Sequence, residues 1–227
     1  MLVDATYQGR SRKLLLHGNR NGFFYVLDRT TGKPLAAKPF VRKLTWASSI
    51  GPDGRPVLTQ TWKPTAEGTE ICPSMDGASN WMSPAFHPNT GLFYLQALEK
   101  CNIYTRRPES WKQGESFYGG AVKPSPHEIP RKYLRAIDIN TGQIRWEREQ
   151  TGTGNGWGGV LATAGGLVFS CDDSGELVAR DAASGEALWH YNANVRWHAS
   201  PMTYAIDGKQ FVAVAAGSTV IAFAAIE

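Results

Sequence analysis

The stretch GNGWGGVLATAGGLVF, residues 154–169, surrounds one tryptophan, Trp157, with several glycines and then continues into an apolar pair of segments. Its Ala164–Gly166 segment predicts a tight hairpin turn, because glycine reaches positive φ angles without steric strain. Val160–Thr163 and Leu167–Ser170 would form the two arms of the hairpin. The glycines before the hairpin have two interpretations. They are turn residues beside a core tryptophan, which is the commoner case, or they leave an indole ring and bare backbone amides open to a flat ligand.

A second pattern occurs three times outside this stretch: a strand, an aspartate, two variable residues, threonine or serine, a glycine, and a second strand. The aspartate side chain can accept backbone N–H groups in such a turn, and the glycine takes the left-handed position. In two copies the second strand carries a tryptophan, Trp146 or Trp189. The three copies are Phe24–Lys33, Leu134–Gln143 and Val178–Glu186.

The sequence around these turns extends each hairpin toward four short strands and predicts an all-β fold. No segment has a convincing 3.6-residue apolar period, so we expect little helix. A repeated four-stranded antiparallel unit with a positioned tryptophan is typical of a β-propeller blade. We therefore predict one partial propeller domain over residues 1–227, with tryptophan docking motifs and about four blades in a half or incomplete ring. The predicted units span residues 2–39, 82–146, 160–191 and 201–224, the last one strand short.

Two stretches interrupt the predicted blades, near residues 42–79 and 102–130. Both are long, polar and rich in proline and glycine. Loops beyond about 12–15 residues are usually functional or mobile. We therefore expect inserted loops here, of the kind that covers a ligand-binding face in propellers.

Composition excludes several functional classes. The chain has 227 residues, 42% of them apolar, and a formal net charge of +4. Its basic residues are scattered, which argues against a nucleic-acid site. No apolar run reaches the roughly 20 residues of a membrane span, and no signal peptide is recognisable at the N-terminus. Three cysteines without a CxxC pair argue against a zinc site and allow one disulfide with one free thiol.

Several polar residues are candidates for binding. Arg20 lies between two predicted strands, where its guanidinium could bind a carboxylate or quinone oxygen, or simply lie at a turn surface. Asn80 could hold a ligand carbonyl or cap its own turn. Cys72 and Cys101 bracket Asn80, either as a disulfide that pins its loop or as two buried thiols.

The remaining titratable residues give weaker signals. The five histidines show no metal-ligand spacing, and we treat them as structural. Glu99, Asp172 and Asp173 could be acids or metal ligands, but Asp172–Gly175 is better explained as a turn. There is no P-loop, no Rossmann glycine pattern and no Gly-x-Ser-x-Gly motif.

Four motifs in order resemble the pyrroloquinoline quinone (PQQ)-dependent alcohol dehydrogenases, and the resemblance covers essentially the whole chain. The motifs are Asn19–Arg29, Asn80–Pro84, Trp157–Thr163 and Pro201–Tyr204. The resemblance implies the C-terminal half of an eight-bladed propeller that binds PQQ near its axis with a calcium or lanthanide ion. It also implies oxidoreductase activity on an alcohol, with electrons passed to an acceptor such as a cytochrome.

The resemblance also implies roles for individual residues. Arg20 would contact the quinone oxygens, and Asn80, Trp157 and Gly158 would contact the cofactor. Cys72 and Cys101 would form a structural disulfide, which suits a periplasmic location.

The family's catalytic base and metal ligands have no counterpart among these residues. Asp4 lies near the expected position of the base but lacks its flanking residues, so we transfer no catalytic or metal-binding role. We therefore expect residues 1–227 alone to bind cofactor through part of a site and to be inactive. The alternative is a non-catalytic propeller scaffold or interaction module that self-associates through open blade edges.

Overall fold

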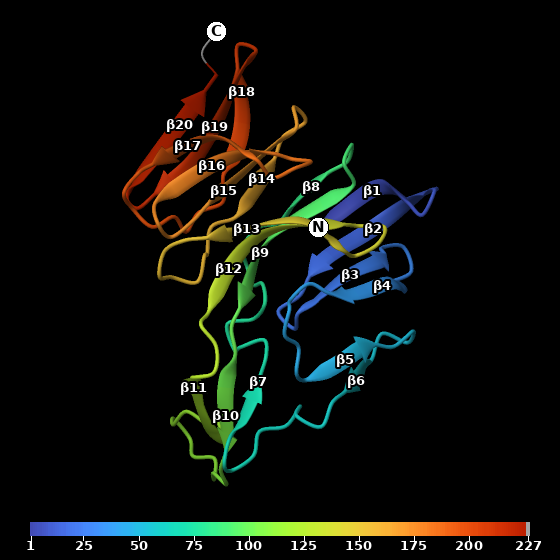
Figure 1. Ribbon diagram of the computed structural model, residues 1–227, viewed down its shortest axis with the longest axis vertical. Coiled ribbons are helices and arrows are strands. Elements are labelled where there is room, and N and C mark those ends of the chain that lie inside the picture. Colours follow the sequence, from blue (N-terminus) through green and yellow to red (C-terminus); the bar gives the residue numbers. More distant parts are fainter. Residues whose placement is uncertain (226–227) are drawn as a thin grey trace.

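The chain folds into a succession of antiparallel β-sheets. The computed structural model describes residues 1–225, which contain twenty strands and no helix (Figure 1). Four sheets follow one another along the chain and do not close into a ring. Their strand orders are β1-β2-β3-β4, β13-β12-β9-β8, β14-β15-β16-β17 and β18-β19-β20. This is the predicted propeller architecture of four-stranded blades, with three strands in the fourth.

The strands of these four sheets, which we call the first to the fourth sheet, have the following bounds. The first contains β1 (Leu2–Tyr7), β2 (Arg10–Gly18), β3 (Phe23–Asp28) and β4 (Pro34–Pro39). The second contains β8 (Ala85–His87), β9 (Leu92–Glu99), β12 (Arg131–Asp138) and β13 (Ile144–Gln150). The third contains β14 (Val160–Ala162), β15 (Leu167–Cys171), β16 (Glu176–Asp181) and β17 (Ala187–Asn192). The fourth contains β18 (Met202–Ile206), β19 (Lys209–Ala216) and β20 (Thr219–Ala224).

Each predicted blade strand is present, and one of them is displaced. The strand expected at residues 82–86 runs instead over Ala85–His87. Pro84 has no N–H to donate to a ladder, and the carbonyl of Ser83 accepts the N–H of Val160 from the third sheet at 2.8 Å. The segment just before β8 therefore joins the second sheet to the third.

The two stretches predicted as inserted loops contain strands of their own. One hairpin pairs β5 with β6, and a separate three-stranded sheet has the order β11-β10-β7. In Figure 1 this small sheet extends away from the other sheets, because β9 and β12 continue toward β10 and β11. These strands are short and interrupted by proline and glycine, so the sequence gives little period-2 signal for them. Their bounds are β5 (Ala47–Ile50), β6 (Pro56–Leu58), β7 (Thr69–Ile71), β10 (Asn102–Arg106) and β11 (Gly120–Pro124).

Apolar cores lie between consecutive sheets. Leu16 and Val26 of the first sheet pack in one cluster with Phe93 and Ile137 of the second. A second cluster joins the second and third sheets, and a third cluster joins the third and fourth. Burial of these side chains is the main favourable term that holds the sheets face to face.

Trp146 links the second sheet to the third in the manner of a docking tryptophan. Its Nε1 donates a hydrogen bond of 3.0 Å to the carbonyl of Ala182. Its ring covers Gly185, whose φ is +72° and whose hypothetical Cβ would lie 2.6 Å from the ring. Trp189 holds the matching register position in the third sheet and packs edge-on against Phe223, with ring centroids 5.1 Å apart. The predicted docking motif is therefore present, and it requires a glycine at the end of the turn.

The docking contact can be isolated by comparing two equivalent glycines. Gly185 and Gly32 end the same kind of turn with φ values of +72° and +73°, but nothing lies within 4 Å of a Cβ added at Gly32. Gly32→Ala should cost about 1–2 kcal/mol from the left-handed backbone alone. Gly185→Ala should cost about 1–3 kcal/mol more, because the methyl group displaces the indole of Trp146. Urea unfolding of both variants measures the difference, and equal losses would contradict the docking role.

Candidate functional site

Arg20 lies at the tip of the turn between β2 and β3. The side-chain oxygen of Asn19 accepts the N–H of Asn21, and the side-chain oxygen of Asn21 accepts the N–H of Phe23, both at 3.0 Å. These two asparagines shape the turn and leave Arg20 exposed. The Arg20 guanidinium donates through Nη2 to the carbonyl of Met75. The guanidinium is thus oriented by a neighbouring segment, although it carries further N–H donors.

Asn80 belongs to that neighbouring segment, Ser74–Trp81. The N–H of Ala78 donates to the carbonyl of Arg20 at 2.9 Å, and the carbonyl of Ala78 accepts the N–H of Leu98 in β9 at 2.7 Å. The segment therefore lies between the Arg20 turn and the second sheet. The side-chain NH₂ of Asn80 donates to the carbonyl of Asp76 at 2.9 Å. The amide thus caps its own turn and retains one N–H and its carbonyl oxygen for other partners.

Trp157 meets the other end of the same segment. Its ring lies 5.8 Å from that of Trp81, at an interplanar angle of 61°. Trp81 is 73% exposed, whereas Trp157 is half-buried. No pattern in the sequence indicated that Trp81 would pair with a residue so distant along the chain.

Gly158 is buried against β15. A Cβ added at Gly158 would lie 3.1 Å from the Cβ of Cys171 and from the Cys171 carbonyl. Packing against the neighbouring strand therefore accounts for this glycine. Any contact of Gly158 with a cofactor would be made by its backbone.

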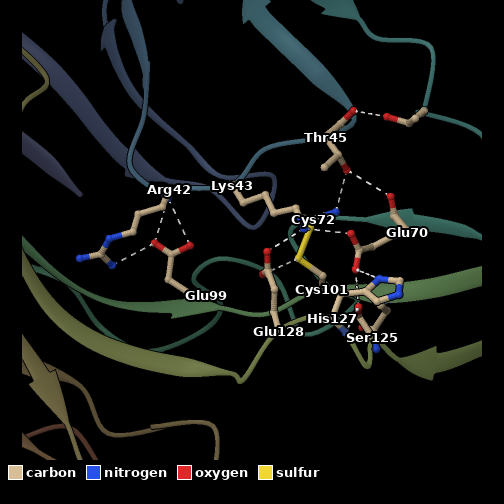
Figure 2. Close-up of a disulfide and its surroundings, with 12 residues drawn as sticks. Arg42, Lys43, Thr45, Glu70, Cys72, Glu99, Cys101, Ser125, His127 and Glu128 are labelled. Atoms are coloured by element: carbon tan, nitrogen blue, oxygen red, sulfur yellow. Dashed lines mark hydrogen bonds and ion pairs between the residues drawn. A yellow bond between two sulfur atoms is a disulfide. The ribbon is translucent and has the colours of Figure 1, made fainter.

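A disulfide between Cys72 and Cys101 anchors the segment that carries Asn80. Both residues are buried, and their Cα atoms are 4.5 Å apart. Directly after it, the N–H of Ser74 donates to the carbonyl of Lys100 at 2.7 Å. The predicted pairing is thus confirmed, and Figure 2 shows the bond with its surroundings. The third cysteine, Cys171, is a buried free thiol, and its burial raises its pKa to about 12.

Polar side chains surround the disulfide on one side (Figure 2). The Glu70 carboxylate accepts hydrogen bonds from Ser125, from Lys43 at 2.9 Å and from His127 at 3.1 Å. These donors, with Ser125 first, lower the pKa of Glu70 to about 2. Lys43 also pairs with Glu128 at 2.6 Å. The cluster ties the β7 strand to the segment after β11 and so supports the disulfide.

One group of metal-type ligand atoms occurs within residues 1–225, namely Cys72, Cys101 and Glu128. The two sulfur atoms are bonded to each other. A disulfide offers no thiolate, which is the form of cysteine that binds metals. We therefore assign no metal site to this group.

The segment Ser74–Trp81 links the candidate residues Arg20, Asn80 and Trp157, and we call these three residues the row. A shallow pocket beside Arg20 is lined by Asn19, Trp46, Pro73 and Met75, and neither Asn80 nor Trp157 borders it. The segment Ser74–Trp81 nevertheless contacts Arg20 at one end and Trp157 at the other. The row provides a fixed cation, an amide and an indole, which suit a planar ligand with carbonyl or carboxylate oxygens.

The Asp172–Gly175 turn was predicted correctly, but it uses only one of its two carboxylates. Asp172 accepts the N–H groups of Ser174 at 2.9 Å and Glu176 at 3.2 Å. Asp173 instead points inward and is buried. The sequence does show a second aspartate, Asp173, beside the turn aspartate Asp172. The direction in which the Asp173 side chain points, however, depends on tertiary packing.

The low pKa of Glu70 gives a testable dependence of stability on pH. The carboxylate stabilises the fold fully above its ordinary pKa near 4.5, and this contribution is lost as the pH falls toward 2. Glu70→Gln should therefore lower the unfolding free energy by about 1 kcal/mol at pH 5, a modest value because solvent screens a partly exposed group. At pH 2, where about half of the folded molecules have Glu70 protonated, only a small part of this difference should remain. Chemical denaturation at both pH values measures the effect, and Glu149→Gln, a change at an exposed carboxylate, is the control. An effect of Glu70→Gln that is the same at both pH values would refute the prediction.

Several known proteins are similar to this chain in sequence. The family model for the glucose/ethanol/alcohol dehydrogenase β-propeller domain of PQQ enzymes matches residues 127–212. The quinoprotein alcohol dehydrogenase PedH of Pseudomonas putida is 37% identical over 226 residues, which are 95% of this chain and 38% of PedH. The lanthanide-dependent methanol dehydrogenase of Methylorubrum extorquens is 33% identical over 232 residues, covering 96% of this chain and 38% of that enzyme.

A solved structure supports the same relationship. The quinohemoprotein alcohol dehydrogenase of Comamonas testosteroni superposes with a TM-score of 0.87 at 33% identity, covering 97% of this chain and 34% of that one. The sequence thus spans little more than a third of the length of these relatives. In sequence and in fold, this chain matches a part of the β-propeller of the PQQ-dependent quinoprotein alcohol dehydrogenases.

Proposed function

We propose that this chain supplies one wall of a PQQ site in a quinoprotein alcohol dehydrogenase. The observation that carries the proposal is the segment Ser74–Trp81, which contacts Arg20 through Met75 and Ala78 and contacts Trp157 through Trp81. Residues from three distant parts of the chain thereby form one row. Of the four motifs that resemble the family, three contain a residue of this row, and the fourth is Pro201–Tyr204.

Each residue of the row has a distinct part in the proposed site. Arg20 would donate hydrogen bonds to quinone oxygens and stabilise negative charge that develops there. Its contact with Met75 orients the guanidinium beforehand. Asn80 would offer its remaining N–H, Gly158 its backbone, and Trp157 an indole face or edge beside the flat ring system.

The whole enzyme's reaction is part of the proposal. When bound, PQQ supplies a quinone that accepts the hydride of an alcohol. The general base and the ligands of a calcium or lanthanide ion would lie outside residues 1–227. One relative is named lanthanide-dependent and others are named quinohemoproteins, which supports a metal ion and a cytochrome-type electron acceptor.

We further propose a periplasmic location. The Cys72–Cys101 disulfide supports it, because such bonds persist in oxidising compartments. The similar quinoprotein alcohol and ethanol dehydrogenases of Pseudomonas putida are bacterial proteins. Separately, residues 1–225 contain no helix with the length and apolarity needed to cross a membrane.

Cofactor binding by this chain can be measured through its tryptophans. PQQ should quench their fluorescence in a saturable way. Arg20→Ala should weaken binding about 10- to 100-fold, as expected for losing hydrogen bonds from a charged group. Arg55→Ala is the control, because Arg55 is 87% exposed in its side chain and pairs only with nearby Asp53 among the described ion pairs. Equal affinity of the Arg20 and Arg55 variants would contradict the role of Arg20.

Because the proposed site is divided between this chain and the rest of the enzyme, we expect this chain alone to have no dehydrogenase activity. Residues 1–227 loaded with PQQ and calcium should reduce no dye with any alcohol, because a base and metal ligands are needed to activate the substrate. A dye-reduction assay over a panel of alcohols measures this. Turnover above a PQQ-only control would show that the chemistry resides in this chain.

One observation favours the alternative of a self-associating scaffold. The turn that ends at Gly32 is equivalent to the turn that Trp146 covers, yet nothing within residues 1–225 lies within 4 Å of a Cβ at Gly32. A pocket beside it is lined by Leu2, Lys13 and Leu15. A second copy could cover this face, and sedimentation velocity distinguishes the cases: a monomer at all concentrations would exclude the scaffold.

A further inference from the structure

Lys132 and Asp173 form a buried ion pair that joins the second sheet to the third. The Nζ atom of Lys132 lies 2.5 Å from Oδ2 of Asp173. The Lys132 side chain is 7% exposed and that of Asp173 is not exposed at all. Of the two carboxylate oxygens, Oδ1 is buried without a hydrogen-bond partner in the part of the chain that the structure describes. Both described partners of this carboxylate, the Lys132 ammonium and the Gly156 N–H, therefore meet at Oδ2.

Both members of the pair also hold the backbone of the segment 151–159. This segment joins β13 to β14 and contains no strand. Lys132 donates from Nζ to the carbonyl of Thr151 at 2.9 Å, and Oδ2 of Asp173 accepts the N–H of Gly156 at 2.8 Å. No ladder supports the segment, so these two bonds hold its first half, together with side-chain hydrogen bonds from Thr151 to Asp172 and from Arg196 to Thr153.

The glycines of the segment fit closely around the same carboxylate. A Cβ added at Gly152 would lie 2.6 Å from the Asp173 backbone carbonyl carbon, and one at Gly154 would lie 2.8 Å from the Asp173 carboxyl carbon. Side chains at these positions would push the backbone away from Asp173. These glycines are therefore explained by packing around a buried charge, and not by an approaching ligand.

The pair acts directly on the residue before Trp157. Gly156, which Asp173 holds, precedes Trp157, and the ring of Trp157 meets that of Trp81 next to Asn80. A shift of Gly156 would move the indole along the row of candidate binding residues. Breaking a buried pair leaves an uncompensated charge, whereas replacing both charges by apolar groups is often tolerated. Such a pair thus contributes more to geometry than to stability.

We propose that Lys132 and Asp173 are positioning residues that fix Trp157 in the cofactor-binding row. This deepens the proposed function and rests on it for the identity of the ligand. The pair itself contacts no cofactor in this scheme. It acts through the Thr151 carbonyl and the Gly156 N–H, and its removal should loosen the segment 151–159 even without a ligand.

Two double variants test the proposal. Lys132→Met with Asp173→Leu removes both charges and both anchors, while Lys132→Met with Asp173→Asn keeps an acceptor for the Gly156 N–H. The control is Arg131→Met with Glu149→Leu, which removes an exposed ion pair of 3.3 Å between β12, the strand that carries Lys132, and the neighbouring β13. Circular dichroism and thermal unfolding establish that each variant is folded.

The first readout is hydrogen exchange of residues 151–158 without cofactor. Loss of the anchors should speed exchange there about tenfold or more in the leucine variant, and by a smaller factor in the asparagine variant. The control should exchange as the unmodified protein does. Unchanged exchange in either double variant overturns the proposal, and the asparagine variant decides if the leucine variant does not fold.

The second readout is PQQ affinity by tryptophan quenching. The leucine variant should bind about tenfold more weakly, since Trp157 is no longer held in place. Faster exchange with unaltered PQQ affinity would overturn the link between the pair and the cofactor row. If the unmodified protein binds no PQQ, the proposed function fails, and the exchange experiment still decides whether the pair holds the segment.

Discussion

The segment Ser74–Trp81 is the constraint on which the proposed site depends. It is fixed at one end by the Cys72–Cys101 disulfide and in its middle by backbone hydrogen bonds to Arg20 and Leu98. A turn of the first sheet, an edge of the second and the entry to the third therefore have fixed positions relative to one another. Without this segment, Arg20 and Trp157 would belong to separate blades with no direct connection.

The fold could be predicted from the sequence because its signals are local. An aspartate that caps a turn and a glycine with positive φ recur at Asp28, Asp138 and Asp181, and each marks the end of a blade's third strand. Such signals depend on neighbouring residues alone. The strands of the inserted stretches were missed, because they are short and pair only among themselves, β5 with β6 and β10 with both β7 and β11.

The site was predicted in part. The resemblance to a family identified Arg20, Asn80 and Trp157, and the structure brings them into one row while their cofactor contacts stay predictions. Trp81 and Lys132 were missed because their roles depend on partners 76 and 41 residues away, Trp157 and Asp173. No period or turn rule encodes a pairing of that kind. In the stretch around Trp157, Gly154 makes room for the buried Asp173 carboxylate and Gly158 makes room for Cys171.

The proposed site requires that Arg20, Asn80 and Trp157 meet the cofactor together, and a crystal structure of the protein with PQQ would show whether they do. The Arg20 guanidinium should lie within hydrogen-bond distance of a quinone oxygen while the Trp157 indole contacts the same ring system. PQQ bound away from this row, or contacting Trp157 with Arg20 turned away from it, would contradict the proposed site.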